Sequence, residues 1–494
     1  MASTPNILLL FTDQQRGDTI GALGHPVIRT PHLDHLTREG VAFTRCYTPS
    51  PVCVAGRCSL LTGQPPHVTG CLANTPMPEP DVMPSLMDHL SSRGYQTHGV
   101  GKMHFTPDFY AMRGFESRDI SEEIPDPDGR DGFRQQLRDN GYDHVADVHG
   151  LRSEMYYVPQ PSQLPAHLHG TAWTADRSIN FLENRDTSRP FFLWSSFIKP
   201  HPPFEVPTPW NRLYRATEVD PPFIPPGYED LLTYWNRNQN RYKYRDRGLD
   251  GFLLRCMRAY YYACISFIDY HVGRILDALG SDIDNTLVLF SSDHGELLGD
   301  YGSFGKRSMH DAAARVPLIA RFPGGEHAGE RCDEVTSLLD IYPTCLAAAG
   351  HDSPSVNDEG RNLAGVAAGR ADREFVFSQY DGHGKGLYMA ASKSHKYVHS
   401  EPDQRDWLFD LEADPHETAD RSTDRACAAA RDRLKRTLID RFKRDGHTEP
   451  LDADDWRQYP VLTVSDDPDG ELIRQDPAAL KSMFEAMIPD SYKN

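Results

Sequence analysis

The sequence predicts an α/β fold in which a doubly wound central sheet is covered by helices on both faces, with a smaller α+β subdomain at the carboxyl-terminal end. Four apolar runs have the length and composition of strands buried on both faces of a sheet, and residues 251–280 show strong helical periodicity. After residue 371 the pattern changes to short alternating runs at 374–379, 386–391 and 395–399, which indicate a small antiparallel sheet. We therefore divide the chain into a larger domain, 1–370, and a subdomain with a polar tail, 371–494.

The composition excludes several classes of protein. The chain has 494 residues, of which 39% are hydrophobic and 25% charged, a balance that suits one large core and a smaller domain. No apolar run approaches the roughly 20 residues that span a bilayer. The formal net charge of −19 is opposite in sign to that of a nucleic-acid-binding protein. A site for an anionic substrate would need positive charge concentrated locally.

The amino-terminal run and the cysteines bear on localisation. The run Asn6–Phe11 is short and lacks a basic leader and a cleavage site, so we interpret it as a strand and not as a signal peptide. Nine scattered cysteines, an odd number, favour a reducing cytoplasm over a disulfide framework. Cys46, Cys53, Cys58 and Cys71 lie close together in sequence, but no two of them form a Cys-x-x-Cys pair, which disfavours a zinc site.

Each of the four apolar runs is followed by polar residues, and in one doubly wound sheet these ends converge on one edge. The runs and the residues that follow them are Asn6–Phe11 with Thr12, Asp13 and Gln14; Tyr95–Gly101 with Lys102, Met103 and His104; Phe191–Phe197 with Ile198, Lys199, Pro200 and His201; and Thr286–Ser292 with Asp293, His294, Gly295 and Glu296. Asp13 and Gln14 offer hard oxygen donors suited to a metal ion, although such a pair can also form a turn or an N-cap.

The stretch Pro51–Gly63 contains Cys53-x-Ala55-x-Arg57 followed by Ser59-Leu60-Leu61-Thr62-Gly63. It resembles the signature of the type I sulfatases, with Ala55 in place of the usual proline. The resemblance continues to about Pro415 and implies the α/β/α fold of the alkaline phosphatase superfamily. In that family the cysteine is oxidised to formylglycine, whose hydrated aldehyde is the nucleophile. Without the resemblance, Cys53 would be interpreted as a buried structural thiol.

The resemblance implies a role for each candidate side chain. The catalytic candidates are Cys53 as the nucleophile, Arg57 as the residue that orients it, and His104 as the base for collapse of the hemiacetal. Lys102 and Lys306 are expected to bind the sulfate oxygens. His201 is expected to act as a sulfate ligand and general acid, and His310 as a further substrate contact. The metal-ligand candidates are Asp13, Gln14, the modified Cys53, Asp293 and His294. The metal expected from the resemblance is Ca²⁺. Mn²⁺ is an alternative because an imidazole and an amide also suit a borderline cation, and Mg²⁺ is a further alternative.

The predicted function is hydrolysis of a small-molecule sulfate monoester after maturation by a formylglycine-generating enzyme. Asp-Gln at positions 13 and 14, where sulfatases commonly have Asp-Asp, resembles the phosphonate monoester hydrolases. Hydrolysis of a phosphonate monoester or phosphodiester is therefore the alternative, and a non-catalytic anion-binding protein is a third hypothesis. We expect no nucleic-acid partner and no membrane partner, and a homo-oligomer is left open.

The remaining segments are assigned more coarsely. Short helices are expected at 30–40, from Arg57 onwards and at 426–444, and loops with short helices at 119–147. The proline-dense stretch 200–226 is expected to pack over the mouth of the site, and the aromatic, basic stretch 234–247 to shape specificity or to contact another subunit.

Overall fold

The computed structural model describes residues 4–124, 129–152, 155–244, 248–351, 359–370, 373–466, 489 and 491. Within these ranges the central sheet has nine strands in the order β11-β2-β10-β8-β1-β6-β3-β4, with β9 paired to β2. The strands are β1 (Asn6–Asp13), β2 (Val41–Tyr47), β3 (Gln96–Gly101), β4 (Ser117–Ile120), β6 (Phe191–Pro200), β8 (Thr286–Ser292), β9 (Arg315–Val316), β10 (Leu318–Arg321) and β11 (Arg331–Ser337). The four predicted strands, β8, β1, β6 and β3, are neighbours and parallel, as in a doubly wound sheet.

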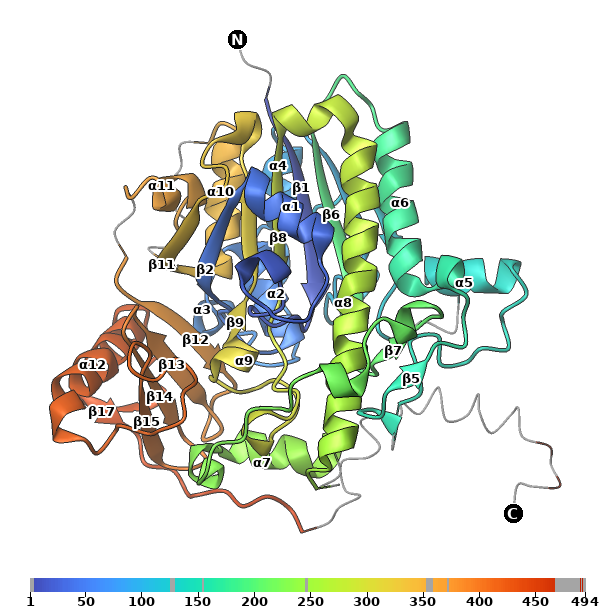
Figure 1. Ribbon diagram of the computed structural model, residues 1–494. Helices are drawn as coiled ribbons and strands as arrows, with labels where there is room; N and C mark the ends of the chain where they lie inside the picture. The colour runs from blue at the N-terminus through green and yellow to red at the C-terminus, as the bar shows by residue number, and fades with distance from the viewer. Residues whose placement is uncertain are drawn as a thin grey trace.

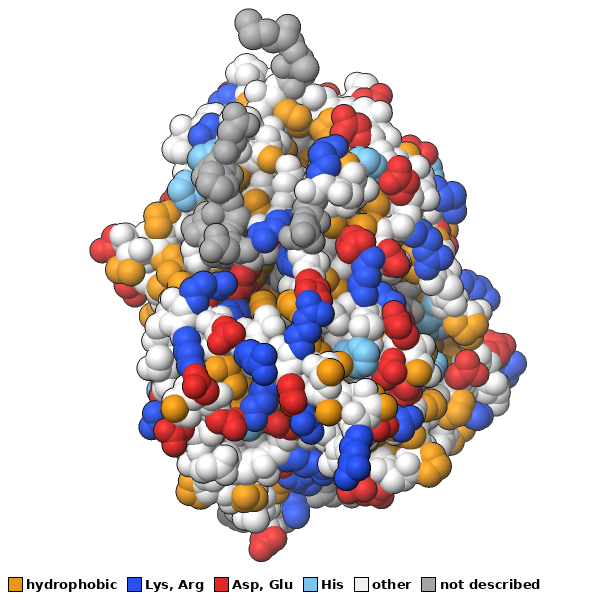
Figure 2. Space-filling model, turned by 90° about the vertical axis from the view of Figure 1, so that its left-hand side faces the viewer, with side chains coloured by type: hydrophobic (Ala, Val, Ile, Leu, Met, Phe, Trp, Pro, Cys, Tyr) orange, Lys and Arg blue, Asp and Glu red, His pale blue; other side chains and the backbone are white. Residues whose placement is uncertain are grey.

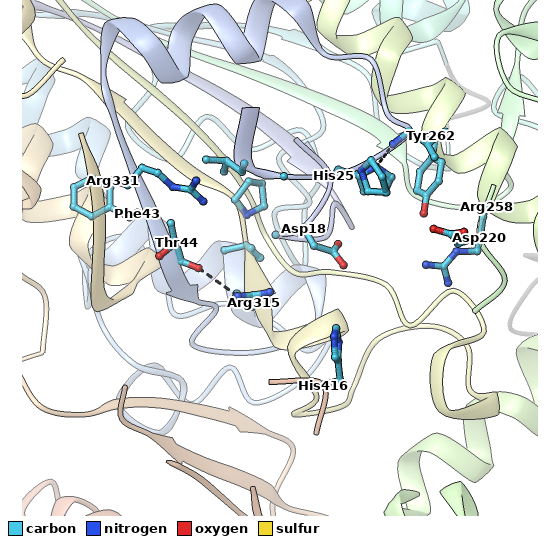
Figure 3. Close-up of a pocket in the computed structure, with 17 residues that line it drawn as sticks. Asp18, His25, Phe43, Thr44, Asp220, Arg258, Tyr262, Arg315, Arg331 and His416 are labelled. Carbon is cyan, nitrogen blue, oxygen red and sulfur yellow. Dashed lines mark hydrogen bonds between the residues drawn. The ribbon is translucent and has the colours of Figure 1, made fainter. Parts of the chain in front are cut away.

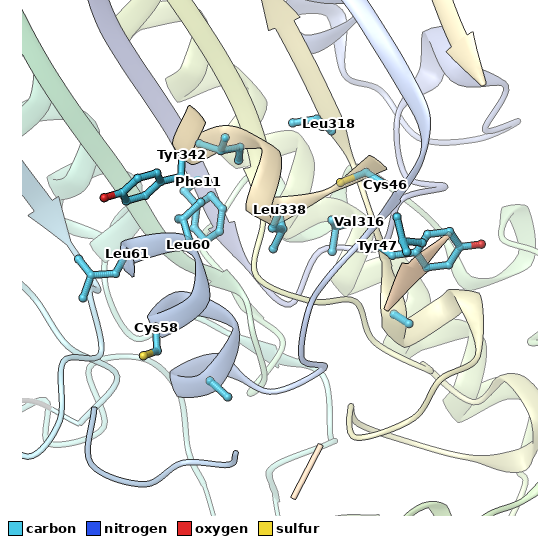
Figure 4. Packing of buried hydrophobic residues seen from close by; sticks show 14 of the residues in the cluster. Phe11, Cys46, Tyr47, Cys58, Leu60, Leu61, Val316, Leu318, Leu338 and Tyr342 are labelled. Atoms are coloured by element: carbon cyan, nitrogen blue, oxygen red, sulfur yellow. The ribbon is translucent and has the colours of Figure 1, made fainter. Parts of the chain in front are cut away.

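Helices cover both faces of this sheet (Figure 1). One face is covered by α1 (Pro31–Glu39), α6 (Gly170–Asn184) and α8 (Gly251–Leu279), and the other by α2 (Cys53–Thr62), α4 (Leu86–Ser91) and α10 (Ile341–Ala348). Side chains alternate along β1, so Leu8 and Leu10 join the core with α8, whereas Ile7, Leu9 and Phe11 join the core with α2. Figure 4 shows Phe11 and Leu60 in this second core. The predicted α/β/α arrangement is confirmed.

The helix predicted to open at Arg57 begins four residues earlier, at Cys53. Val52 is extended, with φ −154° and ψ 145°, and its carbonyl accepts the Gly56 amide at 2.9 Å, which closes the first turn at Cys53. The helix ends at Gly63, whose φ is +67° and where a Cβ would lie 2.7 Å from the Tyr342 ring. Gly63 therefore allows both the left-handed cap and the close approach of α10.

The carboxyl-terminal sheet is antiparallel, as predicted, but has four strands: β12 (Val376–Tyr380), β13 (Leu387–Ala391), β14 (His395–Ser400) and β15 (Arg405–Asp410). The fourth strand was missed. The helix α12 (Ala428–Arg444) packs Leu434, Leu438 and Phe442 against this sheet. The tail after α12 contains a two-stranded sheet of β16 (Leu451–Asp452) and β17 (Asp455–Trp456), and Trp456 joins the core between α12 and the carboxyl-terminal sheet.

The remaining short elements lie in connections. They are α3 (Pro66–Thr69), α5 (Gly132–Asp139), β5 (Gln160–Pro161), β7 (Glu205–Val206), α7 (Tyr234–Gln239), a π-helix at Asn240–Tyr244, α9 (Asp311–Ala314) and α11 (Leu363–Ala367), together with single 3₁₀ turns. Acidic and basic side chains are interspersed on the face shown in Figure 2, so the negative charge is not gathered into one patch there. No helix in the described ranges is long and apolar enough to cross a membrane.

Lys396 joins the subdomain to the larger domain. It is fully buried, and its Nζ donates to the Met309 carbonyl at 2.9 Å, to Glu417 Oε1 at 2.6 Å and to Asp311. Lys396→Met leaves two carboxylates without their cation, so we expect a loss of about 3–5 kcal/mol in the free energy of unfolding, measured by denaturant titration.

The control for this prediction is Lys435→Met, which removes the same charge from an ion pair with Asp455 whose two side chains are 24% and 67% exposed. We expect this change to cost about 0–1 kcal/mol. Equal losses in the two variants would contradict the assignment of Lys396 as the buried connection.

Candidate active site

The carboxyl ends of β1, β6, β8 and β3 bring most of the predicted site residues together. Asp13 is the last residue of β1 and pairs in register with Pro200 of β6, while Asp293 follows β8 directly. Cys53, the first residue of α2, meets them from the connection that follows β2. A helix N-terminus at this edge favours negative charge on residue 53 or on a bound anion.

Four buried side chains form a candidate metal site. The ligand atoms of Asp13, Cys53, Asp293 and His294 all lie within 4.8 Å of one another. His294 Nδ1 donates to the Gly295 carbonyl at 3.0 Å, so its Nε2 keeps a lone pair that faces Cys53 Sγ at 3.3 Å and Asp293 Oδ1 at 3.5 Å. An imidazole whose other nitrogen is fixed by a backbone carbonyl is oriented as a metal ligand requires.

Gln14 completes this donor set. Its backbone is left-handed, with φ 69°, and its Nε2 donates to Glu296. Its Oε1 is buried and has no hydrogen-bond partner in the described part of the chain. The Gln14 amide donates to Asp293 Oδ1 at 3.0 Å, so the residue adjoins the cluster. An orphaned buried carbonyl oxygen there fits a divalent cation, because the ion would satisfy it.

Arg57 holds the two carboxylates. Its side chain is fully buried; Nε donates to Asp293 Oδ2 at 2.8 Å, and Nη2 to Asp13 Oδ2 at 3.2 Å. Lys102 Nζ lies 2.7 Å from the same Asp13 oxygen and 2.8 Å from Glu123 Oε2. Burial acts to raise the pKa of Asp13, as does the Cys53 charge, but Lys102, His201 and Lys306 hold it below its usual range. Asp13 is therefore ionised and ready to bind a cation.

Residue 53 lies in a strongly positive environment. Lys306 Nζ is 2.6 Å from Cys53 Sγ. Burial alone would raise the pKa of the Cys53 thiol, but Lys306, Lys102 and His294 hold the pKa well below its usual range, with a hydrogen bond from His104 adding to the effect. Such a site stabilises negative charge that develops on residue 53 or on a group bound to it.

His201 is buried beside this cluster. Its Nδ1 donates to the Pro202 carbonyl at 2.6 Å, and its Nε2 lies 3.6 Å from Glu123 Oε2. Burial lowers the pKa of His201 to about 4, against the opposing charge of Glu123. The ring is therefore neutral at pH 7 in the ligand-free protein, and its Nε2 faces the anion-binding side chains.

The predicted candidate His310 and the strand-end residue Lys199 lie elsewhere. His310 stacks on Tyr301, with ring centroids 4.1 Å apart, and its Nδ1 faces Glu417 at 3.5 Å. Lys199 Nζ donates to the carbonyls of His149 and Pro203, so it fixes the loop after β6. Within the described residues neither contacts Cys53, because His310 faces Glu417 and the Lys199 amine faces His149, Pro203 and Glu205.

Sequence reasoning missed two acidic residues of the site. Glu123 lies in the charge-rich stretch assigned to loops, and only its contacts with Lys102, Arg152 and His201 reveal its place. Glu296 Oε1 accepts the Leu298 and Gly305 amides at 2.9 and 2.6 Å, and its Oε2 accepts the Tyr157 hydroxyl at 3.0 Å. The sequence signal that could have identified Glu296 as a site residue was its position two residues after His294.

A separate cavity of about 450 Å³ lies apart from this cluster (Figure 3). Asp18, His25, Arg258, Tyr262 and Arg315 are among the side chains around it, and no predicted site residue lines it. The active-site candidate therefore rests on the converging strand ends and not on the size of a cavity.

Comparison with known proteins agrees with this geometry. The sulfatase family model matches residues 5–351, and a model described as N-sulphoglucosamine sulphohydrolase, C-terminal, matches residues 299–444. The chain belongs to the sulfatase family, within the alkaline phosphatase superfamily, and is an arylsulfatase-like hydrolase.

Individual relatives span nearly the whole chain. An arylsulfatase of Clostridium perfringens is 30% identical and covers 93% of this chain and 99% of its own length. A choline-sulfatase of Rhizobium meliloti is 31% identical over 84% of this chain and 81% of its own. Among solved structures, the phosphonate monoester hydrolase of Agrobacterium radiobacter has a TM-score of 0.77 at 26% identity, covering 92% of this chain and 100% of that one.

Proposed function

We propose that the protein hydrolyses a sulfate monoester to an alcohol and inorganic sulfate through a formylglycine at position 53. The observation that carries the proposal is the place of Cys53: the signature cysteine begins α2 between Lys306 and the Asp13, Asp293 and His294 cluster. A formylglycine-generating enzyme would be needed for maturation. The names of the arylsulfatase and choline-sulfatase relatives favour a sulfate ester as substrate.

One divalent metal would be held by Asp13, Gln14, residue 53, Asp293 and His294. When bound, it would supply Lewis-acid stabilisation of the ester oxygen and lower the pKa of the aldehyde hydrate. Ca²⁺ follows from the family resemblance, and the imidazole and amide donors also suit Mn²⁺. Arg57 donates to the Oδ2 atoms of both carboxylates, which would leave their Oδ1 atoms, on the side of Cys53 and His294, to hold the metal.

Each side chain of the site would have its own role in the reaction. One hydroxyl of the hydrated aldehyde, after losing its proton to solvent, attacks sulfur, and the S–O bond to the alcohol breaks. His201, which is neutral in the ligand-free protein, takes up a proton from solvent when the anionic ester binds and gives it to the departing oxygen. Lys102 and Lys306 neutralise the nonbridging oxygens, which is the largest kind of stabilisation for such chemistry. His104 takes the proton of the second hydroxyl, and collapse to the aldehyde expels sulfate.

His201→Ala is expected to slow esters of basic alcohols by about 10²–10⁴-fold and activated aryl esters much less, because a good leaving group needs little protonation. The measurement is kcat/KM across a series of leaving-group pKa values. His310→Ala is the matched control, since its ring stacks on Tyr301 outside the cluster. An equal loss along the series would assign His201 to sulfate binding and leave the acid unidentified.

Hydrolysis of a phosphonate monoester or phosphodiester is the second candidate. It is favoured by Gln14 in the metal-ligand position and by the likeness to the Agrobacterium radiobacter phosphonate monoester hydrolase. Parallel kinetics on an aryl sulfate, an aryl phosphonate and a phosphodiester separate the two. A higher kcat/KM for either phosphorus ester would overturn the sulfate assignment.

A further inference from the structure

Two cations near Cys53, Lys243 and Arg307, have no ion pair with a carboxylate among the described residues. Lys243 is only 5% exposed, and its Nζ makes no hydrogen bond or ion pair with any described residue; it lies over the Tyr156 ring, 5.7 Å from the ring centroid. Arg307 donates to the Tyr242 hydroxyl at 2.6 Å, and its Nε is buried without a hydrogen-bond partner in the described ranges. In contrast, Arg57 and Lys102 are each paired with carboxylates.

Both cations belong to the wall of the active site. Lys306, next to Arg307 in sequence, contacts Cys53, and the Arg307 amide donates to the Pro51 carbonyl at 2.9 Å. The charges of Arg307, Lys306, Glu296 and Cys53 act on Lys243. On its other side Tyr156 packs edge-on against His201, with ring centroids 6.3 Å apart. Lys243 therefore lies over the tyrosine that packs on His201, and the charge of the lysine that contacts the nucleophile acts on it.

The segment that carries Lys243 is fixed to the loop that carries Lys306. The Lys306 amide donates to Gln239 Oε1 at 3.1 Å, and Gln239 Nε2 donates to the Lys306 carbonyl. Asn240 adds a bond from Nδ2 to the Gly302 carbonyl at 2.9 Å. The π-helix Asn240–Tyr244 follows, and such helices are frequent at functional sites. In Figure 1 this segment, next to α7, lies beneath the carboxyl ends of the central strands.

An anion beside Lys243 would stabilise the charged form of its side chain. Burial lowers the pKa of its ammonium group, and the charges of Arg307 and Lys306 lower it further. A buried charge without a partner is costly, and an anion placed against it offsets that cost. A sulfate monoester carries one negative charge, and Lys102 and Lys306 already face it. The positive charges of Lys243 and Arg307 therefore exceed the positive charge needed to bind the single negative charge of the ester group.

We infer that Lys243 and Arg307 bind a second oxyanion, such as a carboxylate or another sulfate, carried by the alcohol half of the substrate. This inference rests on the proposed function and narrows its substrate class to esters with two anionic groups. Lys243 acts as a substrate-binding residue that selects among esters and takes no part in bond breaking.

The kinetic test compares aryl sulfates that carry a carboxylate or a carboxamide at the meta or para position. The wild-type protein is expected to favour one carboxylate over its carboxamide by about tenfold or more in kcat/KM. In Lys243→Met this ratio falls toward one, and Lys243→Arg restores much of it. Lys435→Met, which removes the same charge from α12, keeps the wild-type ratio. No carboxylate preference in the wild type, or an unchanged ratio in Lys243→Met, would overturn the inference.

A binding test separates this inference from the proposed function. Calorimetry on Cys53→Ala protein compares benzenesulfonate with 3- and 4-sulfobenzoate, and repeats the comparison with Lys243→Met added. One sulfobenzoate is expected to bind about tenfold or more tightly than benzenesulfonate, and to lose that advantage with Lys243→Met. If no sulfate ester is hydrolysed but this pattern appears, the reaction is misassigned and the second anion site stands. Equal affinities for the probes would reject the site.

Discussion

Cys53→Ala is expected to abolish turnover, with a loss of about 10⁴–10⁶-fold in kcat, because it removes the group that forms the covalent intermediate. The side chain is small and lies at the first turn of α2, so the fold should survive. The measurement is kcat on an aryl sulfate, with circular dichroism to verify folding.

Cys58→Ala is the matched control, since Cys58 is also a buried cysteine of α2 but belongs to its hydrophobic core. It should cost stability and leave kcat within a few-fold of wild type. Comparable losses of kcat in the two variants, with both proteins folded, would show that α2 matters through its packing and that Cys53 is not the nucleophile.

Asp13→Asn is expected to lose the metal and at least about 10³-fold in kcat, since a metal supplies several kcal/mol of charge stabilisation. Asp13 is fully buried, lies in the candidate ligand cluster and is held by both Lys102 and Arg57. Metal content by plasma mass spectrometry and kcat are measured on the same sample.

Asp18→Asn is the control, because Asp18 lies five residues further along and pairs with Arg16 outside the cluster. It should retain a full complement of metal. An Asp13→Asn protein that keeps both its metal and its activity would refute the proposed ligand set.

The core of the fold could be predicted from sequence because its signals are local. Runs such as Phe191–Phe197 are apolar enough to be recognised as buried strands, and parallel strands of one sheet place their carboxyl ends together. The register of β1 with β6 and β8 follows from contacts between residues far apart in sequence, and no local pattern encodes it.

The parts of the site that were missed depend on such distant contacts. Glu123 belongs to the site because Lys102 and Arg152 come to it from other loops. The conformation of the segment around Lys243 is set by the bonds of Gln239 and Asn240 to residues 302–306. His310 was placed with the substrate because it is near Lys306 in sequence, but α9 directs it toward Glu417.

The central claim is that active protein carries an aldehyde at residue 53, and peptide mass spectrometry of that residue tests it most directly. The protein should be coexpressed with a formylglycine-generating enzyme, and kcat and the mass of the peptide containing Pro51–Arg57 measured on one sample. We expect the formylglycine mass, in a fraction that rises in proportion to kcat across preparations matured to different extents. Active protein that contains only the unmodified Cys53 thiol would contradict the account.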